Sequence, residues 1–258
     1  YSRKETIDEI LYRKNTAVLR LSMISSYLGM SSLSTSSILE IGFGQGYLLN
    51  ELCSVSSNAV GVDFTVRNLD PALSHLSKYC FENNPSDFIA KAIESGSKYD
   101  VIVATHVLEH SPDPNLLLGK LKLLLNDHGI LCFEIPNDFS PLQEFHSVNK
   151  NISSEYWVSP PDHLSYWNKS NFKEFVSLHN LEIFDAFGDY PIEHLLMHDY
   201  FNYNLNKEIG RDAHLLRCKT LNYLFSNSTR DDLLCLLRSL YLCDFSRSFT
   251  YLLRNSES

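Results

Sequence analysis

The segment Ile38–Leu49 constrains the fold of this chain more than any other stretch. It joins a short apolar run to glycines at three alternate positions, and a helical pattern follows. Glycine has no Cβ, so the backbone there turns sharply and approaches a ligand closely. A dinucleotide fingerprint, G-x-G-x-x-G, needs a glycine at position 47, where Tyr47 stands. We therefore predict a strand, a ligand-binding loop for something other than a dinucleotide, and a helix. The glycines are Gly42, Gly44 and Gly46.

Strand and helix patterns alternate from this loop to about residue 187. An apolar run ends at Asp63, close to the spacing of roughly 20 residues at which dinucleotide folds place a carboxylate after the loop. Clear strand patterns also cover Tyr99–Thr105 and Leu181–Phe187, whereas the third strand is weak and Phe88–Ala90 is its best candidate. This alternation predicts a parallel α/β sheet.

A set of ordered motifs resembles those of the class I S-adenosylmethionine-dependent methyltransferases. Glu40–Gly46 resembles their motif I, and Ala59–Asp63 resembles the second strand, whose acidic end holds the ribose hydroxyls. Tyr99–His110 resembles the fourth strand and a Leu-Glu-His signature of the branch with ubiquinone-biosynthesis-type O-methyltransferases and many sugar and small-molecule methyltransferases. Gly129–Asn137 looks like the fifth strand, and Pro161–Trp167 resembles a P-x-H-L-x-Y segment of the same branch.

The resemblance implies a Rossmann-like, doubly wound, mostly parallel seven-stranded α/β sheet. We expect an N-terminal helical segment at 1–35, a cofactor-binding core at 36–188 and a C-terminal helical extension at 189–258. An apolar stripe over Leu233–Leu252 indicates helices in that extension. Packing against the core is the simpler interpretation of the stripe, and a cap over the active site or a homodimer contact is the alternative. In a cap, the residues facing substrate would be Tyr200, Tyr203, Arg211 and His214.

The same resemblance implies S-adenosylmethionine as cofactor and S-adenosylhomocysteine as its product. The glycine backbone would pass beside the methionine and ribose portions, Glu40 would orient the loop and the amino group, and Asp63 would hold the ribose hydroxyls. The implied cofactor-contacting residues are Glu40, Gly42, Phe43, Gly44, Gly46, Asp63, Phe64, Thr105 and His106.

A hydroxyl acceptor needs a general base, and histidine titrates nearest to neutral pH. The candidates are His163, His110 and His106, with Asp162 as an orienting or alternative base. His163 follows prolines in an expected loop, where functional residues concentrate, and both tryptophans of the chain flank it. Their faces suit sugar rings or planar aromatics, although buried packing explains an aromatic cluster equally well. For His110, a structural role at the start of a helix is the simpler interpretation.

Composition excludes several other classes of function. The net charge of −9 argues against a nucleic-acid substrate, which needs clustered Lys and Arg. No apolar run approaches the ~18 residues of a membrane span. Six cysteines contain no C-x-x-C pair, so we expect reduced thiols and a cytoplasmic protein. The fourth strand ends in Thr105 and His106 rather than an acidic residue, and no zinc spacing occurs, so we expect a metal-free enzyme.

We therefore expect methyl transfer to a small molecule or glycan, with a hydroxyl oxygen of a sugar or polysaccharide precursor favoured. N-methylation of a small amine stays open, as does a catalytically silent methyltransferase fold that serves as a scaffold. A dinucleotide-dependent oxidoreductase is the poorest alternative because of Tyr47.

Overall fold

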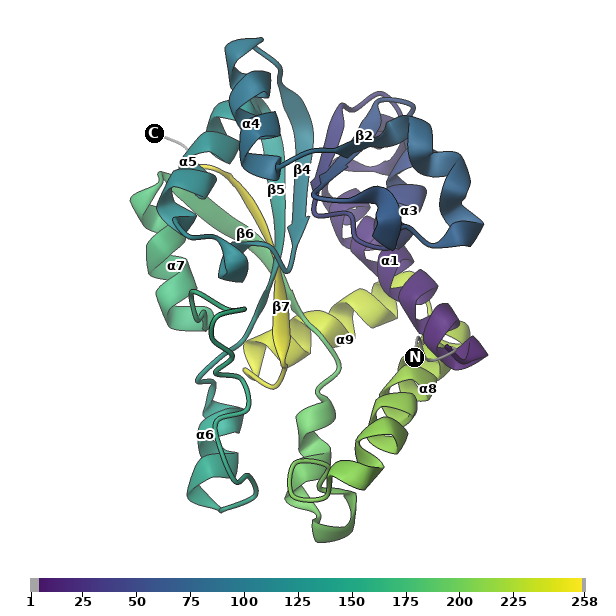
Figure 1. The fold of residues 1–258 in the computed structure, drawn as a ribbon, viewed down its shortest axis with the longest axis vertical. Helices are drawn as coiled ribbons and strands as arrows, with labels where there is room; N and C mark the ends of the chain where they lie inside the picture. Colours follow the sequence, from purple (N-terminus) through teal and green to yellow (C-terminus); the bar gives the residue numbers. More distant parts are fainter. Residues whose placement is uncertain (1–4, 257–258) are drawn as a thin grey trace.

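A computed structural model of the chain describes residues 5–256. Its centre is a seven-stranded sheet with the strand order β3-β2-β1-β4-β5-β7-β6 (Figure 1). The strands β1 to β5 pair in parallel, and β7 runs antiparallel to both of its neighbours, so the sheet is mixed. The strands are β1 (Ile38–Ile41), β2 (Ala59–Asp63), β3 (Cys80–Glu82), β4 (Tyr99–Thr105), β5 (Leu125–Pro136), β6 (Leu181–Gly188) and β7 (Ser248–Asn255).

Helices cover both faces of this sheet (Figure 1). One apolar cluster joins the sheet to α4, α5 and α7, and a second joins the opposite face to α1, α3, α8 and α9. The α-helices are α1 (Ile7–Leu28), α2 (Met30–Leu33), α3 (Tyr47–Val55), α4 (Pro85–Glu94), α5 (Pro114–Leu124), α6 (Pro141–Val148), α7 (Lys169–Leu178), α8 (Gly210–Asn227) and α9 (Arg230–Leu242).

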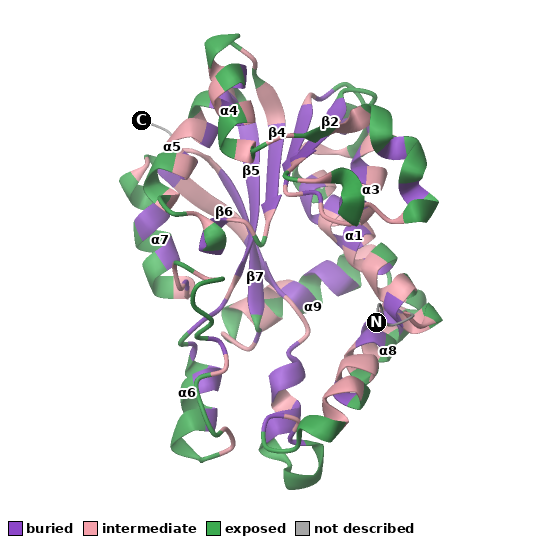
Figure 2. Cartoon of the chain, viewed as in Figure 1, coloured by how far each residue is buried: buried purple, intermediate pink, exposed green. Residues whose placement is uncertain are grey.

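Side-chain alternation along the strands explains the two layers. In β1, Leu39 and Ile41 enter the first cluster, and Ile38 enters the second. Because successive side chains point to opposite faces, a strand covered on both sides is expected to be largely apolar. Figure 2 shows this as continuous burial along the central strands, while the helices are buried on one side only. The apolar runs of the sequence are therefore those of a doubly covered sheet.

Beyond the carboxyl ends of the parallel strands, α6 and α8 project away from the sheet (Figure 1). The helix α8 lies against α1, where Asn15 Nδ2 donates to Asn222 Oδ1 at 2.9 Å and Arg211 forms two hydrogen bonds to Glu9. These contacts join the first helix to α8 and place both helices beside the carboxyl edge of the sheet.

The expected seven-stranded Rossmann-like sheet with helices on both faces is confirmed, although it is mixed and not wholly parallel because β7 is antiparallel to its neighbours. Two predicted elements are wrong. Phe88–Ala90 lies inside α4 and not in a strand; the third strand is β3. Asn84 caps that helix by accepting the Ser86 N–H at 2.9 Å, and Pro85 occupies its first position, where a missing N–H costs nothing.

The second wrong element is the wholly helical C-terminal extension. Residues 248–255 form β7, which inserts between β5 and β6 and completes the sheet. Phe249 and Leu252 belong to the buried part of this strand, so their helical spacing does not reflect a helix. The division of the chain at residues 35 and 188 stays a prediction. Within residues 5–256, no helix combines the length and the apolar character that a membrane crossing requires.

Candidate active site

The glycine loop after β1 is a left-handed turn fastened to the end of β2. Gly42, Gly44 and Gly46 have φ angles of 74°, 52° and 84°, a region that residues with a Cβ rarely adopt. The N–H of Gly44 donates to Asp63 Oδ2 at 2.8 Å. A Cβ on Gly42 would lie 2.9 Å from Val107 Cγ2, whereas one on Gly44 would meet nothing within 4 Å. The loop therefore packs tightly on one side and leaves its middle open.

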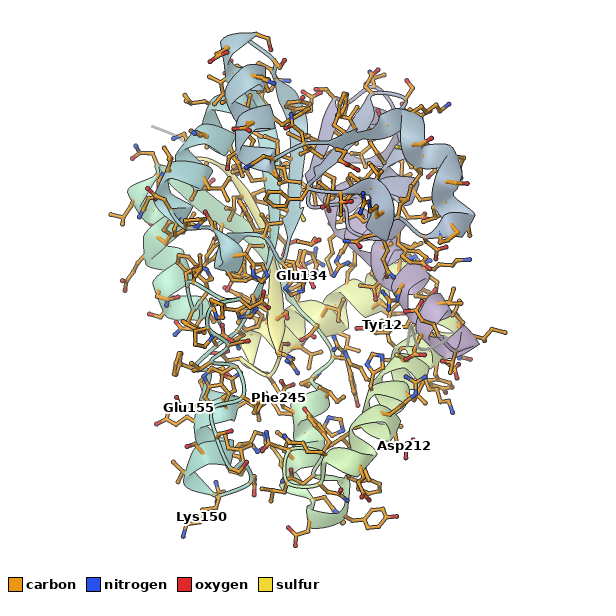
Figure 3. All side chains as sticks on the ribbon, in the orientation of Figure 1. Tyr12, Glu134, Lys150, Glu155, Asp212 and Phe245 are labelled. Carbon is orange, nitrogen blue, oxygen red and sulfur yellow. The ribbon has the colours of Figure 1, made fainter. Side chains whose placement is uncertain are left out.

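A cavity of about 580 Å³ opens beside this loop, within the usual size range of small-molecule sites. Its walls come from α1, the glycine loop, the ends of β4 and β5, α8 and the start of β7. Figure 3 shows Tyr12 of α1 and Glu134 of β5 on either side of the space between these elements. The predicted cofactor residues in its lining are Glu40, Phe43, Gly46, Thr105 and His106.

Four other predicted cofactor residues stand next to the cavity and not in its lining. Gly42, Gly44 and Asp63 form the loop and strand unit described above. Phe64 follows Asp63 and is 69% exposed, so an aromatic face is available to solvent beside the loop.

Glu40 is the buried acid of the glycine motif. Its side chain is 1% exposed, and its Oε2 has no hydrogen-bond partner within residues 5–256. Burial raises the pKa of Glu40 to about 8, although the nearby charge of Arg20 opposes this. A buried polar atom without a partner is costly, so this oxygen is available to accept a hydrogen bond from a ligand in the cavity.

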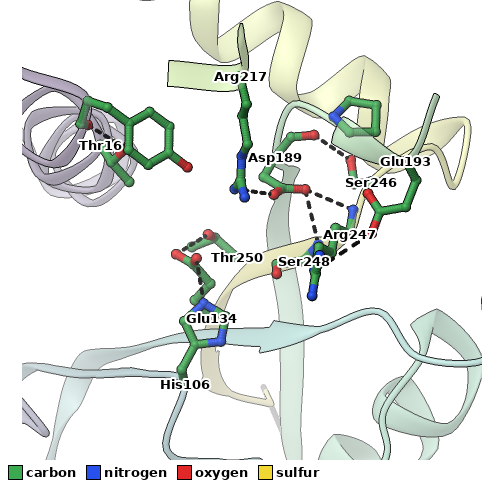
Figure 4. A network of polar contacts seen from close by, with 12 residues as sticks. Thr16, His106, Glu134, Asp189, Glu193, Arg217, Ser246, Arg247, Ser248 and Thr250 are labelled. Atoms are coloured by element: carbon green, nitrogen blue, oxygen red, sulfur yellow. Dashed lines mark hydrogen bonds and ion pairs between the residues drawn. The ribbon is translucent and has the colours of Figure 1, made fainter. Parts of the chain in front are cut away.

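An ion-pair network centred on Glu134 lines the cavity, and Figure 4 shows its contacts with His106 and Thr250. Arg20 Nε and Nη2 donate to the two carboxylate oxygens of Glu134 at 2.6 and 2.7 Å, and Thr250 Oγ1 donates to the same carboxylate at 3.3 Å. His106 bridges Glu134 and Glu109 with distances of 3.1 Å to each. Burial alone would raise the pKa of Glu134, but the charge of Arg20 and the His106 hydrogen bond hold it well below its usual value.

The same contacts make His106 a cation. Burial lowers the pKa of His106, but its hydrogen bonds to Glu109 and Glu134 outweigh this effect and raise the pKa to about 9. Both ring nitrogens therefore carry hydrogen near neutral pH. His106 is thus placed to stabilise negative charge and is a poor candidate for the base.

We predict a pH-dependent contribution of His106 to stability. A raised folded-state pKa stabilises the fold fully below about pH 6.5, and the stabilisation is lost as pH rises through about 9. Because the ring is 44% exposed, solvent screening limits the contribution to about 1–2 kcal/mol. Urea unfolding of the wild type and H106Q at pH 6 and pH 10 measures it. A difference between the two proteins that is the same at both pH values would contradict the prediction.

At the other end of the cavity, Asp189 organises a second network (Figure 4). Arg217 Nη2 donates to Asp189 Oδ2 at 2.9 Å, and the backbone N–H groups of Arg247 and Ser248 donate to Asp189 Oδ1 at 2.9 and 3.0 Å. The guanidinium of Arg247 lies 3.6 Å from Glu193, beyond hydrogen-bond distance.

The predicted catalytic residues come together, but outside the cavity lining. His110 Nδ1 lies 2.6 Å from the carbonyl oxygen of Asp162, and the His110 and His163 rings meet edge to face at 5.0 Å. A carbonyl only accepts, so Nδ1 of His110 carries the hydrogen and Nε2 is free to accept a proton. Glu109 lies beside these two histidines, and each of the three residues has an atom able to bind a metal ion within 4.8 Å of the others. A rule based on sequence spacing cannot find this group, because His163 comes from another segment of the chain.

The residues that were expected to face substrate differ in their burial and in their distance from the cavity lining. Trp157 and Trp167 are 6% and 7% exposed, so they pack in the interior and present no open face. Arg211 is held by Glu9, whereas His214 lines the cavity. Of the other two residues, Tyr200 is exposed and Tyr203 packs beside Ile192 and Leu195.

Residues 13–186 match the family model described as a methyltransferase domain, and this match covers well over half of the chain. The chain belongs to this methyltransferase family. It is 30% identical over 106 residues to a ubiquinone biosynthesis O-methyltransferase of Actinobacillus pleuropneumoniae, covering 39% of this chain and 45% of the relative. It is 27% identical over 157 residues to the Bartonella tribocorum protein of the same name, covering 58% and 62%. The methyltransferase chain thus spans about half the length of the curated relatives it matches.

Solved structures agree on the fold of this methyltransferase. The plantazolicin methyltransferase, crystallised with S-adenosylhomocysteine and a substrate analogue, superposes with a TM-score of 0.54 at 16% identity, covering 95% of this chain and 85% of that chain. A methyltransferase from Archaeoglobus fulgidus gives 0.53 at 13% identity, covering 93% of each chain. At these identities the likeness concerns the fold alone.

Sequence reasoning missed the charged side chains of this methyltransferase cavity. A weak signal existed for two of them, because Arg20 and Glu134 each stand as a charged residue within an apolar run of the sequence. For the others no local signal stands out, since they meet only in the folded chain. The missed residues are Arg20, Glu134, Asp189, Arg217 and Arg247.

Proposed function

We propose that this chain binds S-adenosylmethionine at the glycine loop and transfers its methyl group to a hydroxyl oxygen of a small molecule. The observation that carries the proposal is the left-handed glycine loop, fastened to Asp63 and opening beside a cavity that holds the unpartnered oxygen of Glu40. The names of the relatives support oxygen as the acceptor atom. A phenol and a sugar or polysaccharide precursor are the acceptor classes to compare.

The residues present suit this cofactor. Asp63 offers a carboxylate at the end of β2, Glu40 offers a buried acceptor, and the open side of Gly44 permits close approach of a ligand. When bound, S-adenosylmethionine supplies a methyl group on a positively charged sulfur, which is already activated for displacement. The chain's contribution is then chiefly to hold the acceptor oxygen in line and to receive its proton.

Isothermal calorimetry tests the cofactor assignment. We expect micromolar binding of S-adenosylmethionine and S-adenosylhomocysteine and none of NADH. A labelled-methyl assay over phenols, sugars and amines then identifies the acceptor atom. Failure of both S-adenosyl compounds to bind would overturn the proposal and favour a scaffold role, and a preference for amines would replace oxygen by nitrogen.

We infer that His214 is a further candidate for the general base, besides the predicted His163, His110 and Asp162. His214 lines the cavity, and burial lowers its pKa, so the ring is neutral near pH 7 and able to accept a proton. The other three residues stand together outside the lining, where a loop movement would be needed to bring them to the acceptor.

Single variants decide between these bases. Replacing the base should lower kcat about 100-fold or more and remove the acidic limb of the pH profile, with unchanged affinity for S-adenosylhomocysteine. We predict this result for H214Q or for H163A, but not for both. H128Q is the control, since His128 is exposed in the first part of β5. Full activity of both H214Q and H163A would exclude each as the base.

A homodimer contact through the C-terminal helices stays a prediction, which sedimentation of the purified chain would check.

A further inference from the structure

Several cationic side chains line the cavity, although the chain as a whole carries a negative net charge. The chain carries a net charge of −9, yet Arg13, Arg20, Arg217, Arg247 and the His106 cation all line the cavity. The lining carboxyl groups are matched inside the protein or neutral. Glu134 binds Arg20, Glu9 binds Arg211, Asp189 binds Arg217, and Glu40 has a pKa of about 8. Arg13 pairs with Glu5, and Arg247 forms an ion pair with Glu193 at 3.6 Å, so what distinguishes the arginines of the cavity is how many of their N–H groups are used.

Two of these arginines have unused hydrogen-bond donors. A guanidinium carries five N–H groups in a planar fork. Arg20 uses its fork on Glu134, but Arg217 forms one side-chain hydrogen bond, to Asp189. Within residues 5–256, the guanidinium of Arg247 forms no hydrogen bond, and its nearest carboxylate, on Glu193, is 3.6 Å away. The unsatisfied donors therefore belong to Arg217 and Arg247.

Asp189 holds these two residues at one place. One of its oxygens accepts from the Arg217 side chain, and the other accepts from the backbone N–H of Arg247 and of Ser248. Ser248 also lines the cavity. Figure 4 shows this group on the far side of the cavity from His106 and Glu134. Its place at the start of β7 and on α8 separates it from the glycine loop, where the proposed function places the cofactor.

We propose that the methyl acceptor carries an anionic group, a carboxylate or a phosphate, and that Arg217 and Arg247 bind this group. The inference rests on the proposed function, because it concerns the acceptor of that same reaction. Paired guanidinium forks match the geometry of both anions, and an anion there accepts from the N–H groups that Arg217 and Arg247 leave unused. The acceptor then lies with its anionic end at α8 and β7 and its hydroxyl toward the glycine loop.

Calorimetry on the chain saturated with S-adenosylhomocysteine tests this site without knowledge of the acceptor. Inorganic phosphate and malonate are titrated separately, and we expect one or both to bind with a Kd below about 20 mM. The stronger of the two identifies the anion. R247Q should weaken that binding about tenfold or more, since it removes hydrogen bonds between charged groups. R254Q is the matched control, because Arg254 lies on β7, the strand that follows Arg247, and pairs with Glu182 at the surface.

The outcomes separate this inference from the proposed function. Binding of S-adenosylhomocysteine with no binding of either anion overturns the anion site and leaves the cofactor assignment intact. Loss of S-adenosylhomocysteine affinity in R247Q would assign the arginine to the cofactor and also overturn the inference. If R247Q fails to fold by circular dichroism, R247K and the wild-type titrations decide, because lysine keeps the charge but loses the fork. Absence of S-adenosyl binding in the wild type would refute the proposed function itself.

Discussion

Replacing Glu134 with alanine is expected to lower the free energy of unfolding by about 3–5 kcal/mol, the cost typical of removing one partner from a buried ion pair. The variant leaves Arg20 buried without its carboxylate and removes one of the two acids that hold His106. Urea unfolding at pH 7 measures the loss. The low pKa of Glu134 means that its stabilisation is present above about pH 4.5 and disappears as pH falls through the folded-state pKa.

The exposed pair of Glu182 and Arg254 provides the control on the same sheet. Its side chains are 40% and 37% exposed, so solvent screens their attraction and E182A should cost at most about 1 kcal/mol. An equal loss in E134A and E182A would show that the buried network does not stabilise the fold in the way its geometry indicates.

Replacing Asp63 with alanine is expected to weaken the binding of S-adenosylhomocysteine by about 10- to 100-fold, or about 1–3 kcal/mol. The variant removes the carboxylate proposed to hold the ribose hydroxyls and releases the N–H of Gly44, so the loop loses its fastening to β2. D63N separates the two effects, because an amide oxygen still accepts from Gly44 but carries no charge. Calorimetry measures both variants.

D87A is the control for this measurement. Asp87 lies in the first turn of α4, on a helix that packs against the sheet, and takes no part in the glycine loop. Affinity in D63A that matches D87A and the wild type would remove Asp63 from the cofactor site.

The parts of the fold that were predictable are those with local causes. The turn at Glu40–Gly46 can be predicted from the local sequence, because alternate glycines permit positive φ angles that other residues rarely adopt. The helix over Phe88–Ala90 also has a local signal, namely the cap at Asn84 and the proline after it. The strand prediction was wrong because it rested on a short apolar run and not on this cap.

β7 and the cavity were not predictable in this way. The buried residues of β7 alternate between both faces of the sheet, and the short apolar run Tyr251–Leu253 carries no period that distinguishes a strand from a buried helix. The cavity draws Arg20 from α1, Glu134 from β5 and Arg217 from α8, and no spacing rule connects residues so far apart. The cofactor loop is therefore encoded locally, whereas the proposed acceptor site depends on the whole fold.

The insertion of β7 between β5 and β6 has a consequence for biosynthesis. Thr250 of β7 and its partner Glu134 of β5 are separated by 116 residues, so during translation the apolar edge of β5 must wait for a strand that the ribosome makes much later. Strand pairing over such a distance is slow, and an uncovered apolar edge invites association with other chains. We therefore expect chaperones to bind the nascent chain mainly at the unpaired edge of β5, before β7 has been synthesised.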